Sequence, residues 1–241
     1  MRRLIVLLLV LTALAAGCGT PDKPEVEGAV VVVLVDMTTS AVDDANSYMK
    51  NFTTVLNAAR GGEEIFVVPI TGSFVPQIHT SSTMPAASFN PVSDAEKLKD
   101  ARLKLQNDVA RLLGSERPKE PGTAILSGIA KAAAIFAAEG KGRPHTLVIF
   151  SDMIEQGKLD FTTADLTPPE PVIEALEKDG LAPKLDADVY VAGITAGQAQ
   201  TYSVPQERFN AITKFWAAYF ARAGARLGPY DRDLLDFRLE G

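Results

Sequence analysis

Three groups of polar residues stand at points of this 241-residue chain where side chains can do chemistry. The groups are Asp36 with the hydroxyls of Thr38, Thr39 and Ser40, then Thr123, then Ser151 with Asp152. Each group alone also fits a local role, because Ser40 and Thr123 are good helix caps and Ser151-Asp152 suits an Asx-turn. Asp36, however, directly follows an apolar run, and the end of a buried strand is where open α/β sheets bind ligands.

The elements that position these groups are read from the hydrophobic pattern. Residues 30–35 are six consecutive apolar residues, which predicts a strand buried on both faces of a parallel sheet. We expect further strands over 64–70, 146–150 and 188–194, short strands over 74–78 and 225–227, and helices over 41–60, 95–113, 123–139, 171–178 and 205–223. This alternation predicts an α/β fold with a three-layer αβα, doubly wound, mostly parallel sheet of the Rossmann-like kind.

The three groups together resemble the metal-ion-dependent adhesion site of the von Willebrand factor A (VWA) family. That site has the form D-x-[ST]-x-S, followed by a Thr and then an Asp, and here Thr123 comes 87 residues after Asp36 and 29 before Asp152. The resemblance extends from about residue 30 to 227 in the order and type of elements. It implies that residues 29–241 form one VWA-like domain.

The resemblance also implies a role for each residue. Thr38 and Ser40 would bind a metal ion directly, and Thr123 directly or through water. Asp36 and Asp152 would accept hydrogen bonds from metal-bound waters. Such oxygen ligands suit Mg²⁺, or Mn²⁺ or Ca²⁺, and the neutral hydroxyls leave the ion able to attract a partner's Asp or Glu carboxylate. The family usually has Gly after the second Asp, where this chain has Met153, so the loop geometry there departs from the pattern.

Two expectations concern the surroundings of this site. Asp36 and Asp152 should lie on neighbouring strands where the strand order reverses, close enough that without a cation the pKa of one carboxyl is raised. The loops over 71–91, 153–171 and 195–204 should surround them, because each leaves the carboxyl end of a strand.

The N-terminal segment predicts export and lipidation. Arg2 and Arg3 precede an apolar stretch over 4–14, which is too short to span a bilayer, and small residues lead directly to Cys18. This resembles the lipobox of bacterial lipoproteins, although an ordinary secretory signal beside a stray cysteine is the alternative. We therefore expect a signal peptide over 1–17, a lipidated Cys18 with a tether over 18–28, and an extracytoplasmic domain anchored to a bacterial membrane.

Net charge and missing motifs reduce the number of function classes that this chain can belong to. The net charge of −6 disfavours nucleic-acid binding, which needs clusters of Lys and Arg. A phosphohydrolase of the haloacid-dehalogenase type is a weak alternative, because position 38 is Thr where that chemistry needs a second Asp. No G-x-G-x-x-G follows the first strand and no G-x-S-x-G occurs, while His79 and His145 stand alone. The sequence thus favours a non-enzymatic module that binds a protein partner through a metal, with a metal-free scaffold of the same fold as the alternative.

Overall fold

The computed structural model describes residues 28–38, 41, 44–72, 75–115, 122–193, 204–234 and 236–239. The predicted signal peptide, Cys18, Ser40 and all but one residue of the 195–204 loop lie outside this part of the chain. Within it, no helix is both long and apolar enough to cross a membrane.

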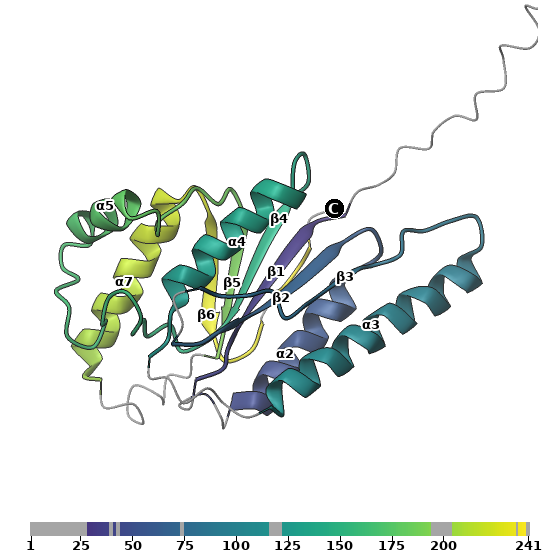
Figure 1. Ribbon diagram of the computed structural model, residues 1–241, viewed down its shortest axis with the longest axis horizontal. Coiled ribbons are helices and arrows are strands. Elements are labelled where there is room, and N and C mark those ends of the chain that lie inside the picture. The colour runs from purple at the N-terminus through teal and green to yellow at the C-terminus, as the bar shows by residue number, and fades with distance from the viewer. Residues whose placement is uncertain are drawn as a thin grey trace, which may run out of the picture.

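The described chain forms one mostly parallel sheet of six strands (Figure 1). The strands are β1 (Val30–Asp36), β2 (Glu64–Ile70), β3 (Thr80–Thr83), β4 (His145–Phe150), β5 (Asp188–Ala192) and β6 (Arg226–Asp231). Their order is β3-β2-β1-β4-β5-β6, and every neighbouring pair is parallel except β2 with β3. The chain thus moves outward from β1 in one direction, then returns to β4 and moves outward in the other.

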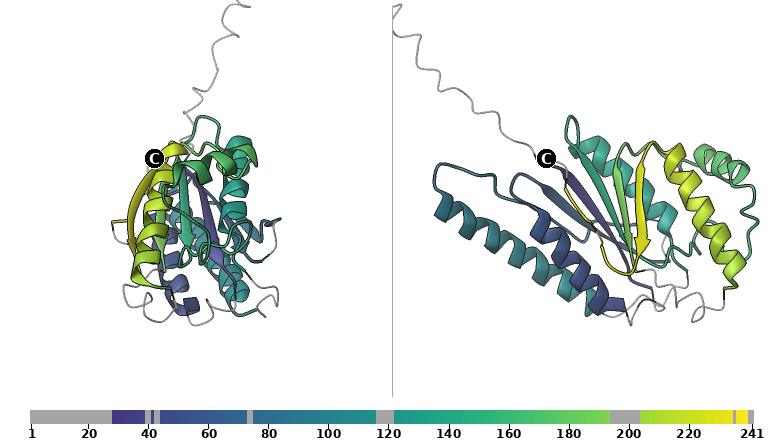
Figure 2. Two further views of the ribbon diagram at one scale, coloured as in Figure 1. Left: turned by 90° about the vertical axis from the view of Figure 1, so that its left-hand side faces the viewer. Right: turned by 180° about the vertical axis from the view of Figure 1, so that it is seen from behind.

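Five helices flank the sheet within the described residues: α2 (Ala45–Ala58), α3 (Pro91–Leu113), α4 (Ile125–Glu139), α5 (Glu170–Lys178) and α7 (Gln206–Arg222). Helices α2 and α3 lie side by side near β1–β3, as the view from behind shows (Figure 2). The observed α/β class and mostly parallel sheet agree with the sequence-based prediction.

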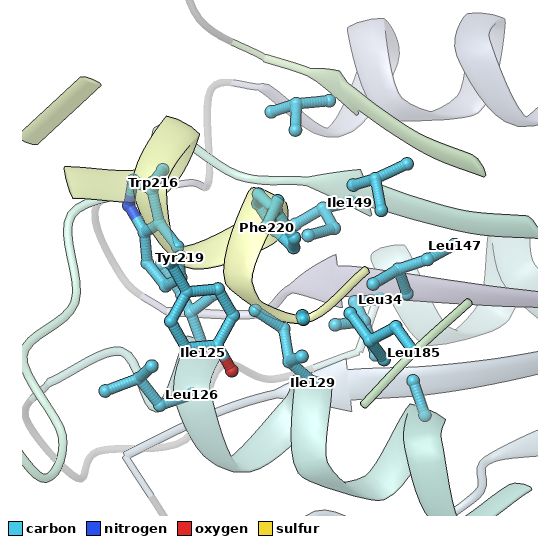
Figure 3. Close-up of a cluster of buried hydrophobic side chains, with 14 of the residues drawn as sticks. Leu34, Ile125, Leu126, Ile129, Leu147, Ile149, Leu185, Trp216, Tyr219 and Phe220 are labelled. Carbon is cyan, nitrogen blue, oxygen red and sulfur yellow. The ribbon is translucent and has the colours of Figure 1, made fainter. Parts of the chain in front are cut away.

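Strand β1 is the centre of the fold because every one of its residues is buried. Its side chains alternate between two apolar clusters. Val30, Val32 and Leu34 belong to a cluster that includes residues of α4 and α7 (Figure 3), while Val31, Val33 and Val35 belong to one that includes residues of α2 and α3. Full burial of each such side chain contributes about 1.5–3 kcal/mol, so the position of Asp36 at the end of β1 is firmly fixed.

The predicted edge strand over 74–78 is wrong, because the edge strand is β3, over Thr80–Thr83. This strand is antiparallel to β2 and carries the chain back toward the start of β2, where the Met84 amide donates to the Glu63 carbonyl. The second half of the 71–91 loop therefore lies at the end of the sheet opposite Asp36. The expectation that this whole loop borders the site is corrected accordingly.

Several helix starts also differ from the prediction. Helix α3 begins at Pro91, four residues earlier than expected, because Asn90 caps it by accepting from the Ser93 amide at 3.2 Å. Helix α2 begins at Ala45 rather than residue 41, and α4 at Ile125 rather than Thr123. The residue at the N-cap of α4 is Ala124, so Thr123 does not act as the helix cap.

Candidate metal centre

The two acidic groups of the predicted site lie on adjacent strands. Strands β1 and β4 are parallel neighbours with Val35 opposite Phe150, and the reversal of strand order falls between them. Asp36 ends β1, and Asp152 follows β4 by two residues. Both carboxylates therefore stand at the carboxyl edge of the sheet, in the place where ligands bind in open α/β folds.

The Asp36 carboxylate is 2% exposed and is held by protein donors at both oxygens. Its Oδ1 accepts from the Thr38 amide at 2.9 Å and from the Thr38 hydroxyl at 2.6 Å. Its Oδ2 accepts from the Ser151 hydroxyl at 3.0 Å. The Thr38 hydroxyl donates its proton to Asp36, so the lone pairs of the hydroxyl oxygen remain available to a cation. Ser151, which was not among the predicted metal-binding residues, links the two strand ends directly.

The Asp152 carboxylate is half-buried, and its Oδ1 accepts from the Ile154 amide at 2.9 Å. Burial raises the pKa of this carboxyl to about 7, and the negative charge of Asp36 adds to the effect. Asp44, at the start of α2, contributes in the same direction and was not among the predicted site residues. Burial is thus the larger cause of the raised pKa, and the like charge of Asp36 acts in the expected direction.

Met153 adopts the left-handed backbone that glycine would supply at this position. Its φ is +64°, and its side chain is buried in the cluster that includes α4 and α7. The Trp216 indole on α7 donates from Nε1 to the Met153 carbonyl at 2.9 Å (Figure 3 shows Trp216 in this cluster). The strained turn, which costs about 1–2 kcal/mol for a side chain other than glycine, is thus compensated by packing, and the loop bearing Asp152 keeps a tight turn despite the departure from the family pattern.

Thr123 is buried and lies two residues before α4, on the connection from α3 to α4. The Gln156 amide donates to its carbonyl at 2.9 Å, and the next amide, of Ala124, donates to the Thr71 carbonyl at 3.0 Å. These two bonds attach the Thr123 segment to the loop after β4 on one side and to the end of β2 on the other.

Two further titratable residues, His145 and Glu155, were not predicted to bind the metal. His145 begins β4 at the opposite end of the sheet, where its ring stacks on Phe136 and approaches the carbonyls of Gly140 and Asp186. Glu155 is fully buried near Asp152, and burial raises the pKa of its carboxyl to about 7. Nothing in the local sequence distinguished Glu155 from a solvent-exposed loop residue.

The chemistry of the described donors fits a hard divalent cation. Asp36 and Asp152 supply negative charge, and Thr38 and Thr123 are buried hydroxyl residues; Mg²⁺ prefers such oxygen ligands and retains several waters. In the described ranges no group of three or more His, Cys, Asp or Glu side chains could hold a metal ion.

These features define an α/β domain with a candidate cation site at the point where the strand order of its sheet reverses. Similar solved structures include the open conformation of the pilus adhesin SpaC from Lactobacillus rhamnosus GG, at 12% identity and a TM-score of 0.49 over 85% of this chain. Another is von Willebrand factor type A from Catenulispora acidiphila, at 12% identity and a TM-score of 0.46 over 82% of this chain. The matched regions make up 28% and 43% of those chains. No protein-family model and no curated protein matches the chain.

Proposed function

We propose that this domain is a binding module that engages a protein partner through a divalent metal ion, with Mg²⁺ as the first candidate. The observation that carries the proposal is the placement of two acidic side chains, Asp36 at the end of β1 and Asp152 two residues after the adjacent strand β4, at one edge of the sheet. Burial raises the pKa of Asp152, and the charge of Asp36 adds to the effect. A cation between such groups removes their repulsion, which gives the protein a thermodynamic reason to bind one.

In this proposal Asp36, Thr38, Ser40, Thr123 and Asp152 would hold the ion. Asp36 and Asp152 would supply charge and accept from waters on the ion, and the hydroxyls would contact the ion without neutralising it. When bound, the ion would offer a carboxylate oxygen a place to bind. The partner would accordingly present an exposed Asp or Glu, and a chelator would dissociate the complex.

The proposal places the domain outside the cytoplasm. It comprises a three-layer, doubly wound VWA-like domain over 29–241, attached to a bacterial membrane through lipid on Cys18 after removal of residues 1–17. The role is binding rather than catalysis, and the net charge of −6 does not favour nucleic acid.

One observation favours a metal-free scaffold as the second candidate. Both oxygens of Asp36 already accept hydrogen bonds, from Thr38 and Ser151. Such a carboxylate is satisfied within the protein, as buried polar groups in structural positions are.

Two measurements distinguish the metal-binding module from the metal-free scaffold. They are isothermal calorimetry with Mg²⁺, and thermal unfolding in Mg²⁺ and in chelator. A ligand at a hundredfold excess over its Kd stabilises the fold by about 2.7 kcal/mol, so the wild type should unfold at higher temperature in Mg²⁺. Asp36→Asn should remove this increase, because the variant keeps the side-chain shape and lacks the charge.

Asp160→Asn is a matched control. Asp160 Oδ1 accepts from the amide and the hydroxyl of Thr162 at 2.9 and 2.6 Å, the same local arrangement as Asp36 with Thr38, and it lies on an exposed loop. The control should respond to Mg²⁺ like the wild type. Absence of Mg²⁺ and Mn²⁺ binding at millimolar concentration would favour the scaffold.

A further inference from the structure

Glu155 is a fully buried carboxylate three residues after Asp152. Its Oε2 accepts from the Leu126 amide at 2.8 Å, and its Oε1 accepts from the Gly157 amide at 2.8 Å and the Lys158 amide at 3.1 Å. One side chain thus joins the loop after β4 to the first turn of α4. On α7, burial and then the charge of Glu155 raise the pKa of Tyr219, whose hydroxyl donates to the Leu181 carbonyl.

The contact with α4 replaces a missing helix cap. The first amides of a helix have no partner within it, and the N-cap residue Ala124 has no side chain that can accept from them. Glu155 accepts from one of these amides across the fold, and its negative charge is favourable at a helix N-terminus. The capped Leu126 amide lies three residues after Thr123, so this contact fixes where the helix that follows Thr123 begins.

The backbone of the same loop contacts the other side of Thr123. The Gln156 amide donates to the Thr123 carbonyl. Gly122, at φ +96°, approaches so closely that an added Cβ would lie 2.5 Å from the Gln156 carbonyl oxygen, and a Cβ at Gly157 would lie 2.9 Å from Ala124. Residues 155–157 therefore contact residues 122–126 at three places, which lie before, at and after Thr123.

We propose that Glu155 is a positioning residue of the candidate metal site, which holds the Thr123 segment in register with the loop that bears Asp152. The inference rests on the proposed metal-binding function. Because both Glu155 oxygens act as acceptors from backbone N–H groups, an amide cannot replace the carboxylate: its NH₂ group necessarily faces a donor. Residues that orient metal ligands typically change metal affinity by about 10–100-fold when altered.

The test is Mg²⁺ titration by calorimetry of Glu155→Gln, with Glu63→Gln as the matched control. Glu63 is also a buried carboxylate that accepts from backbone amides, those of Arg60 at 2.8 Å and Gly61 at 2.7 Å, but it precedes β2 at the opposite end of the sheet. Both variants lose the same kind of hydrogen bond, so the thermal unfolding of each is measured beside its Mg²⁺ titration. We expect the Mg²⁺ Kd to rise at least tenfold in Glu155→Gln and to stay unchanged in Glu63→Gln.

A second pair of variants, Gly122→Ala and its control Gly142→Ala, tests the same inference if Glu155→Gln fails to fold. Gly122→Ala adds a methyl group against the Gln156 carbonyl, whereas Gly142→Ala, also at positive φ (+82°), meets nothing within 4 Å. Backbone strain is common to both, so weaker Mg²⁺ binding in Gly122→Ala alone supports the positioning role.

The outcomes separate the two proposals. A wild type that does not bind Mg²⁺ overturns the metal-binding function and this inference with it. A wild type that binds, with Glu155→Gln and Gly122→Ala binding equally well, overturns the inference alone. Equal weakening in Glu155→Gln and Glu63→Gln also overturns it, because the effect then follows general destabilisation.

Discussion

Asp152→Asn should make the metal-free protein more stable at neutral pH. The pKa of Asp152 is raised from its ordinary value of 3.8 to about 7, first by burial and then by the charge of Asp36. Above pH 7 the folded protein must hold this carboxylate ionised in an environment that disfavours the charge. An amide at this position carries no charge, and its oxygen can still accept from the Ile154 amide.

The sign and size of this effect follow from the difference between the Asp152 pKa in the folded and unfolded states. Because the folded state holds the Asp152 proton more tightly than the unfolded state, the destabilisation is absent below pH 3.8, grows as the pH rises, and is complete above about pH 7. At about 1.4 kcal/mol per pKa unit, the full shift of the Asp152 pKa corresponds to roughly 4 kcal/mol of unfolding free energy. Partial contact of the side chain with solvent screens the charge, so we expect about 1–3 kcal/mol.

The assay is urea unfolding in chelator at several pH values between 4 and 8. Wild type and Asp152→Asn should have similar unfolding free energies near pH 4, and the variant should become the more stable of the two as the pH rises. The raised pKa of Glu155 gives both proteins a further decline in stability over the same range, so the difference between them isolates Asp152. A difference that does not change with pH, or a variant that is less stable at pH 8, would refute the reasoning.

Two further predictions concern the turn after Asp152 and the N-terminus. Met153→Gly should destabilise the protein by about 2 kcal/mol, and by at most about 4, in denaturant unfolding. Loss of a buried Met side chain costs about 2–5 kcal/mol, and release of the left-handed strain returns only about 1–2. A more stable variant would show that strain dominates at this turn. Cys18→Ser should abolish the diacylated mature N-terminus in mass spectra of the membrane fraction, and a wild type with an unmodified thiol at residue 18 would contradict the lipoprotein prediction.

The position of the candidate site was predictable because it depends on local pattern. A run of apolar residues that ends in a polar group marks the carboxyl end of a buried strand, and this placed Asp36 and Asp152 at one edge of the sheet. The edge strand was placed too early because residues 74–78 contain more apolar side chains than the true strand, Thr80–Thr83, which is selected by pairing with β2.

The contacts that shape the site were not predictable, because they join residues far apart in the chain. Trp216 lies 63 residues from Met153, whose carbonyl it binds, and Glu155 lies 29 residues from Leu126. The sequence identified Met153 as a departure from the family pattern, but only the packing around α7 shows how the left-handed turn is retained. Likewise, the acidic residue at 155 acquires a role only because Ala124 leaves the start of α4 uncapped.

The direction of β1 has a mechanical consequence. The strand starts beside Gly28 and ends at Asp36, so a tether upstream of Gly28 and a partner at the candidate site would pull on opposite ends of one strand. Such a load runs lengthwise along β1, which is hydrogen-bonded to β2 on one side and β4 on the other. Ladder bonds lie across the direction of pull, so the force is shared by two rows of bonds in shear rather than opening them one at a time.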